Sequence, residues 1–222
     1  TPLLCDAVEE MIVSHRHRFI FAAVPKTGTH SVRQALREHM GSEDIEQVNL
    51  FVSSRFPWSE LASIPHGHLS LRQIRSCLGE TTFSDYFRFA FVRNPFDRFV
   101  SYCAFMVRGG DAFRQNPREV MRHFLFREPP EQHILFQPQA ALLVGDDGRT
   151  LLTDALGRVE EMQPSYDAIC ARIGISPRPL DRINATSHRD YRDYYDRDLI
   201  QGVRARYAFD LDLFGYAFEG LK

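Results

Sequence analysis

The sequence predicts an α/β fold with a central parallel sheet and helices on both of its faces. Two short, nearly continuous apolar runs, at residues 18–24 and 87–92, are typical of strands that are covered on both sides. Each run leads into a segment whose apolar residues recur with a helical period. Strands that alternate with helices in this way indicate a parallel sheet.

The elements follow in order along the chain. An apolar stripe first predicts a helix over residues 2–14. We expect the strands at 18–24 and 87–92 and further helices at 30–40, 96–107, 117–126, 163–173 and 196–207, the last capped by Asp196. No internal repeat or long linker divides the chain. We therefore expect one domain over residues 1–222.

Composition narrows the possible functions. The chain has 222 residues, 44% of them hydrophobic, and a net charge of −2. That charge argues against a broad nucleic-acid-binding surface. No run of about 18 apolar residues is present, so no membrane span is expected. Widely spaced Cys5, Cys77, Cys103 and Cys170 suggest reduced thiols rather than a zinc site or disulfide framework. We expect a cytoplasmic enzyme; a Golgi-lumen domain trimmed before Thr1 is the alternative.

The first motif is a strand-to-helix turn suited to an anion. The helix after it directs backbone N–H groups and its positive dipole end toward the turn. Gly28 permits a tight backbone, Lys26 adds a charge, and nearby hydroxyls add donors. The candidate anion-binding residues are Pro25, Lys26, Thr27, Gly28, Thr29, His30 and Ser31. An ordinary turn with a surface lysine is the alternative. A nucleotide triphosphatase loop is disfavoured because the lysine precedes the glycine.

The second motif, "FVRNPFDRFVSYCAF", places a cation at the end of the second strand. Arg93 offers a planar fork of donors suited to a phosphate, and Ser101 can add a hydroxyl about two turns into the following helix. Pro95 is suited to opening that helix. A capping or ion-pair role is the alternative for Arg93, and Arg98 is interpreted as a surface or ion-pair residue.

The third motif is "HGH", residues 66–68. In an extended segment His66 and His68 would share a face. They can serve as a general base for transfer to a hydroxyl, as metal ligands, or as structural histidines. No third ligand stands at a convincing spacing, so we expect no metal site. His15 and His17 are interpreted as solvated.

These motifs together resemble the sulfotransferase family. "PKTGTHS" is similar to its 5′-phosphosulfate loop, and "FVRNPFDRFVS" is similar to its 3′-phosphate segment. The resemblance is closest to the carbohydrate branch, with the uronyl 2-O-sulfotransferases and related bacterial enzymes. It extends from about residue 18 to the C-terminus. His30 departs from the family, which commonly has a small or hydroxylated residue there.

The resemblance implies a P-loop-like sheet of sulfotransferase type and the donor 3′-phosphoadenosine 5′-phosphosulfate (PAPS). It names His68 as the base, His66 as its support or a substrate contact, and Lys26 as the stabiliser of the leaving group. Thr186, Ser187 and His188 would close over the donor. The implied acceptor is a hydroxyl on a carbohydrate or small molecule, without a metal. A nucleotide or sugar kinase and a non-catalytic nucleotide binder are the alternatives.

Overall fold

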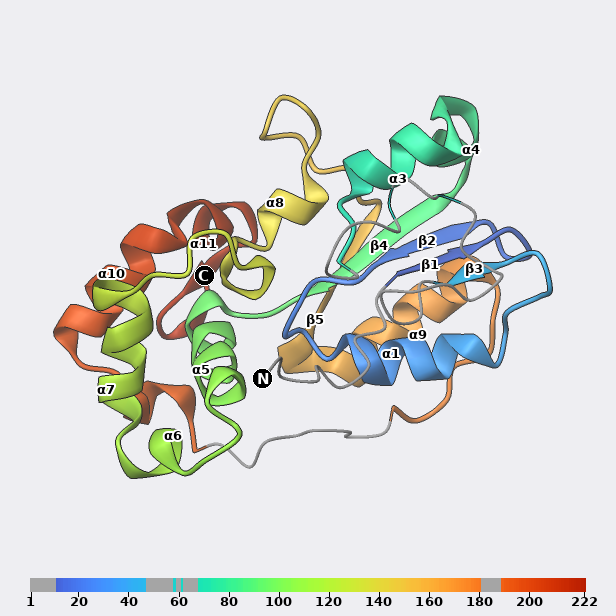
Figure 1. Ribbon diagram of the computed structural model, residues 1–222. Coiled ribbons are helices and arrows are strands. Elements are labelled where there is room, and N and C mark those ends of the chain that lie inside the picture. Colours follow the sequence, from blue (N-terminus) through green and yellow to red (C-terminus); the bar gives the residue numbers. More distant parts are fainter. Residues whose placement is uncertain (1–10, 47–57, 59–60, 62–67, 181–188) are drawn as a thin grey trace. The chain divides into compact units, whose positions relative to one another are not determined.

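The computed structural model describes residues 11–46, 58, 61, 68–180 and 189–222 (Figure 1). Its contacts divide the chain into two compact units. The first unit comprises Thr1–Val92 and Ala141–Ile183, and the second comprises Arg93–Ala140 and Asn184–Lys222. Each is described below by itself, and a single functional domain over the whole chain stays a prediction.

The first unit contains a mixed five-stranded sheet. Its strands are β1 (Ile12–Ser14), β2 (Phe19–Ala22), β3 (Ile45–Glu46), β4 (Phe87–Val92) and β5 (Ala155–Arg158). They lie in the order β3-β1-β2-β4-β5, with β2, β4 and β5 parallel and β1 antiparallel to both of its neighbours. The predicted α/β class is confirmed. The sheet is mixed, however, because the chain turns straight back from β1 into β2.

Helices cover both faces of this sheet. The first unit's helices are α1 (Thr29–Arg37), α3 (Leu71–Leu78), α4 (Glu80–Asp85), α8 (Ala140–Leu143) and α9 (Met162–Ile173). A 3₁₀ turn (Val159–Glu161) precedes α9. The first residue of α8, Ala140, is still assigned to the second unit. Figure 1 shows α1 and α9 on one face and α3 and α4 on the other. Alternate strand residues, among them Phe21 and Phe89, pack with α1 and α9 in a buried apolar core.

The second unit is helical, with one small hairpin. It contains α5 (Pro95–Met106), α6 (Ala112–Gln115), α7 (Pro117–Arg122), a π-helical turn (His123–Arg127), 3₁₀ turns (Ile134–Phe136 and Tyr191–Tyr194), α10 (Arg197–Arg206), α11 (Ala208–Leu213) and the hairpin strands β6 (Tyr216–Ala217) and β7 (Gly220–Leu221). Aromatic rings form its core: Phe136 packs with Phe99 and Tyr102 of α5 and with Tyr207.

Most of the predicted elements are confirmed. The strand at 87–92 has the predicted bounds, and the helices near 30–40, 96–107, 163–173 and 196–207 shift by no more than a few residues. Asp196 caps α10 as expected, since its carboxylate accepts the N–H of Leu199 at 3.1 Å. The helix predicted at 117–126 is α-helical only to Arg122 and continues as the π-helical turn.

The helix predicted over residues 2–14 is wrong where the structure describes it. Ile12–Ser14 is strand β1, and all three of its side chains are buried. An apolar stretch this short fits either period, and pairing with β2 decides for the strand. His15 and His17 are therefore not solvated residues at a helix end. His15 Nδ1 lies 2.7 Å from the hydroxyl of Tyr86, and His17 Nε2 lies 3.1 Å from a backbone carbonyl oxygen.

The described cysteines agree with the expected reduced state. Cys77, Cys103 and Cys170 are free thiols, and Cys5 lies outside the described residues. Cys103 is fully buried in α5, where burial raises the pKa of its thiol well above the usual value. A buried neutral thiol of this kind is a core residue rather than a reactive one.

Candidate functional site

The loop between β2 and α1 has an unusual backbone. Lys26 (φ 66°) and Gly28 (φ 70°) both adopt the left-handed conformation, two residues apart. Glycine does so readily, whereas a lysine there is strained by roughly 1–3 kcal/mol. Left-handed residues in a tight turn point successive backbone N–H groups into a shared concavity that suits an anion. The loop thus has the backbone form that the first motif predicts.

Helix α1 begins at this loop. Gly28 occupies the N-cap position, no side chain caps the first turn, and that turn carries no acidic residue. The first N–H groups of a helix need acceptors that the helix itself cannot supply. An oxyanion can provide them and also benefits from the helix dipole. Of the predicted donors here, Thr29 is half-buried, His30 is exposed and Ser31 is buried.

Thr27 has a different role from the one predicted. Its side chain is fully buried, and its hydroxyl donates to the carbonyl oxygen of Val24 at 2.8 Å. The hydroxyl hydrogen is therefore used inside the loop and does not reach a ligand. Thr27 and the buried Pro25 shape the loop from within.

We expect Gly28→Ala to destabilise the first unit by about 1–2 kcal/mol, because an L-residue must then hold φ 70°. The new Cβ would also lie 2.5 Å from Cε of Met162, although that flexible tip can move aside. Denaturant unfolding measures the change. Gly109→Ala is the matched control, since Gly109 has open space around it and no positive φ. Equal stability of the two variants would contradict the expectation.

His68 lies against the chain that enters this loop. Its ring is buried, 4% exposed, and Nδ1 is 3.0 Å from the carbonyl oxygen of Ala23. A carbonyl can only accept, so Nδ1 carries the hydrogen, and in the neutral ring Nε2 is the proton acceptor. Two residues later Ser70 starts α3 with a capping box that includes Gln73. His68 is thus held between a strand end and a capped helix.

The first unit therefore brings two of the three predicted motifs together. Ala23, the partner of His68, stands three residues before Lys26. The other histidine of the H-G-H motif, His66, lies outside the described residues, as do Thr186, Ser187 and His188.

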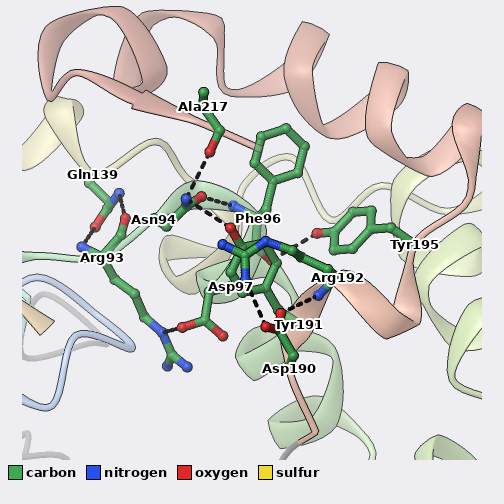
Figure 2. A network of polar contacts seen from close by, with 10 residues as sticks. All are labelled: Arg93, Asn94, Phe96, Asp97, Gln139, Asp190, Tyr191, Arg192, Tyr195 and Ala217. Carbon is green, nitrogen blue, oxygen red and sulfur yellow. Dashed lines mark hydrogen bonds and ion pairs between the residues drawn. The ribbon is translucent and has the colours of Figure 1, made fainter. Parts of the chain in front are cut away.

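Arg93 belongs to the second unit and is oriented by an acid on the next helix (Figure 2). Its Nε donates to Oδ2 of Asp97 at 2.7 Å. Asn94 caps α5 by accepting the N–H of Phe96 at 3.0 Å, and Pro95 is the first helical residue, as predicted. Ser101 is buried one turn beyond Asp97, so the two share a face of α5.

Of the two roles expected for Arg98, surface residue or ion-pair residue, the first is wrong. Its side chain is 2% exposed and donates to the carbonyl oxygen of Leu135 at 3.0 Å. Burial lowers the pKa of its guanidinium, and the nearby Tyr207 and Asp210 oppose this shift. Arg98 therefore supplies a buried positive charge in the core of the second unit.

The model "Sulfotransferase family" matches residues 9–122, just over half of the chain. The chain belongs to the sulfotransferase family. No curated protein and no solved structure gives a significant match. The family match includes the loop at Lys26, His68, Arg93 and Ser101. A sulfotransferase is a transferase that moves a sulfuryl group to an acceptor, and the α/β fold agrees with this membership.

In the part of the chain that the structure describes, no group of three or more His, Cys, Asp or Glu side chains is arranged to hold a metal ion. Within the same residues, no helix combines the length and the apolar character needed to cross a bilayer.

Sequence reasoning missed one cationic residue at the edge of the sheet. This residue is Arg158, the last residue of β5. It pairs in register with Val92 of the parallel strand β4, so it ends at the same carboxyl edge of the sheet from which the Lys26 loop emerges. The backbone N–H of Arg158 donates to the hydroxyl of Ser165 at 3.0 Å. A glycine–arginine pair at the end of a short apolar segment was the available signal, but β5 itself was not predicted.

Proposed function

We propose that this sulfotransferase-family chain transfers the sulfuryl group of PAPS to a hydroxyl of a carbohydrate acceptor. One observation carries the proposal: the buried ring of His68 is hydrogen-bonded to the strand end that leads into the loop of Lys26 and Gly28. A proton acceptor, a cation and an anion-binding backbone thus lie on one short piece of structure. These are the groups that sulfuryl transfer requires.

The residues present fit the donor substrate in two places. The uncapped first turn of α1, with Thr29, His30 and Ser31, suits the 5′-phosphosulfate. The guanidinium of Arg93, held by Asp97, suits the 3′-phosphate together with the hydroxyl of Ser101. Thr186, Ser187 and His188 are proposed to close over the donor, on the resemblance alone.

The proposed reaction is an in-line displacement. His68 accepts the proton of the acceptor hydroxyl at Nε2 as that oxygen bonds to sulfur. The bond between sulfur and the bridging oxygen breaks at the same time, and adenosine 3′,5′-bisphosphate leaves. Lys26 stabilises the negative charge that develops on the bridging oxygen. His66 is proposed to support His68 or contact the acceptor.

We propose that no divalent ion takes part. A sulfuryl group has one fewer ionisable oxygen than a terminal phosphoryl group, so less charge requires neutralisation than in phosphoryl transfer. Turnover that is unchanged by a chelator would agree, and turnover that needs an added divalent ion would contradict it.

The acceptor class comes from the H-G-H motif and its resemblance to the uronyl 2-O-sulfotransferases. Four arginines that could contact an acidic glycan, Arg114, Arg118, Arg122 and Arg127, make contacts within the second unit. Arg114 pairs with Asp111, Arg127 pairs with Glu119, and Arg122 pairs with Asp196. Arg118 donates to three backbone carbonyl oxygens at residues 193–195. These contacts favour a structural role for the four arginines.

A cytoplasmic location is part of the proposal, and the Golgi lumen is the alternative. The free thiols Cys77, Cys103 and Cys170 support a reducing compartment. Fractionation of cells that produce the protein would distinguish the two.

The experiment that tests the proposed function is transfer of labelled sulfate from PAPS to a panel of carbohydrate and phenolic hydroxyl acceptors. Label in a carbohydrate product supports the proposal, and label only in phenols overturns the acceptor class. Magnesium-dependent turnover of ATP without any sulfate transfer would instead indicate a kinase. Donor binding without transfer to any acceptor would indicate a non-catalytic binder.

We expect Arg93→Ala to weaken the binding of adenosine 3′,5′-bisphosphate by roughly 10- to 100-fold, the scale for a lost hydrogen-bonded charge. Binding of 5′-AMP should change little because it has no 3′-phosphate. Calorimetry with both ligands measures the difference. Arg108→Ala is the control, since Arg108 is exposed just beyond the same helix α5. Equal losses for both ligands would contradict the role of Arg93.

A further inference from the structure

One buried side chain holds the backbone of Arg93 from both sides (Figure 2). Oε1 of Gln139 accepts the N–H of Arg93 at 3.0 Å, and its Nε2 donates to the carbonyl oxygen of Arg93 at 2.9 Å. Arg93 stands between the end of β4 and the start of α5, where neither element supplies these partners. Gln139 has no exposed surface. The amide therefore fixes the position of this one residue.

Gln139 is in turn fixed by a buried acid from the end of the chain. Asp210 of α11 is fully buried, and its carboxylate accepts the backbone N–H groups of Gln139 at 2.8 Å and Ala140 at 2.9 Å. The side chain of Gln139 lies 3.5 Å from the same carboxylate. Burial raises the pKa of Asp210, while the positive charge of Arg98 lowers it. A buried carboxylate is costly to keep, so its place indicates a specific role.

The two ends of Arg93 are thus held independently. Gln139 and, behind it, Asp210 hold the backbone, and Asp97 holds the guanidinium through Nε. An arginine that is fixed in this way loses less side-chain freedom when it binds a phosphate. Binding then costs less free energy than it would with a mobile side chain.

We propose that Gln139 and Asp210 are positioning residues that give the donor site its preference for a 3′-phosphate, acting through Arg93. This inference rests on the proposed function, in which Arg93 binds that phosphate. It assigns a role to two residues that lie beyond the family match. Gln139 is 46 positions from Arg93, and Asp210 is 71 positions from Gln139.

The test replaces Gln139 with methionine, which has a similar volume and no hydrogen-bonding amide. We expect the ratio of affinities for adenosine 3′,5′-bisphosphate and 5′-AMP to fall roughly tenfold, the scale of about two net hydrogen bonds. In an Arg93→Ala background the same replacement should leave the ratio unchanged, because the residue that it positions is gone.

The first unit offers a matched control. Gln163 makes a similar two-way clamp: its amide donates to the carbonyl oxygen of Arg178 at 3.0 Å and accepts the N–H of Leu180 at 2.7 Å. Gln163→Met therefore removes a comparable pair of bonds. It should lower the free energy of unfolding to a similar degree and leave the ratio of the two affinities intact.

A second pair of variants keeps the test decisive if Gln139→Met fails to fold. Asp210→Asn turns one acceptor oxygen into a donor that faces N–H groups, and it should also lower the ratio. Asp212→Asn makes the same change at an exposed site on α11 and should not. A ratio equal to that of the wild type in folded Gln139→Met or Asp210→Asn would overturn the inference. A wild-type protein that does not prefer the 3′-phosphate would instead overturn the assignment of Arg93 in the proposed function.

Discussion

We expect His68→Ala to lower kcat by about 10²–10⁴, the range for loss of a general base. Affinity for adenosine 3′,5′-bisphosphate should stay close to that of the wild type. The reason is geometric: Nδ1 lies against the carbonyl oxygen of Ala23, so in the proposed reaction Nε2 accepts the proton of the acceptor hydroxyl. Single-turnover sulfate transfer measures the chemical step apart from product release.

A buried side chain cannot be truncated without some structural effect, so a second variant separates the two causes. The amide nitrogen of His68→Asn can replace Nδ1 as the donor to Ala23, whereas no atom replaces Nε2 as a base. We expect His68→Asn to be more stable than His68→Ala and equally slow. His123→Ala, at a partly exposed histidine of the second unit, should leave kcat unchanged. Weakened donor binding with unchanged kcat would make His68 a binding residue instead.

Elements with strong local signals were predictable from the sequence. The run "FRFAFV" is apolar apart from Arg88, and it forms β4 with the predicted bounds. Helices α5 and α10 begin where Asn94, Pro95 and Asp196 place their starts. In these helices a side chain beside the first turn accepts one of its free backbone N–H groups, so neighbouring residues suffice to define where the helix begins.

Elements that depend on distant partners were not predictable. Strand β1 is three residues long and β3 only two, and both exist through their pairing in the sheet. No periodicity can be read from so few residues. The same holds for the antiparallel half of the sheet, which follows from the tight return between β1 and β2 rather than from any motif.

The residues of the candidate site also differ in how far the sequence alone could predict them. Lys26 and Gly28 belong to one continuous segment, so the sequence displays the loop directly. Gln139 contacts Arg93 across 46 positions, and Asp210 contacts Gln139 across 71. Nothing in "QPQAAL" or "FDLDLF" marks either residue. The prediction that the Thr27 hydroxyl donates to a ligand was wrong for a further reason. A hydroxyl in a motif can bond to the loop or to the ligand, and only the contact to Val24 decides between them.

The second large effect is expected at Lys26. The chain contains 27 cationic Lys and Arg residues, yet its only lysines are Lys26 and Lys222. Every other cationic side chain of these two types is therefore an arginine, and a lysine stands in the proposed anion-binding loop. A compact ammonium can stabilise the charge that develops on a single bridging oxygen, whereas a planar guanidinium suits several oxygens of a phosphate. This difference is what the proposed reaction requires at the leaving group.

We expect Lys26→Ala to reduce turnover by roughly 10²–10³, the scale for one electrostatic donor to a transition state. Lys26→Asn should be equally slow, although asparagine tolerates the left-handed backbone at φ 66° and so preserves the loop. Lys26→Arg keeps the charge and should recover only part of the rate, because its fork is too broad for one oxygen. Lys222→Ala, at an exposed ion pair with Asp212, is the control and should be fully active. Near-normal turnover in Lys26→Asn would show that the backbone alone binds the leaving group, and the lysine would then have no part in the chemistry.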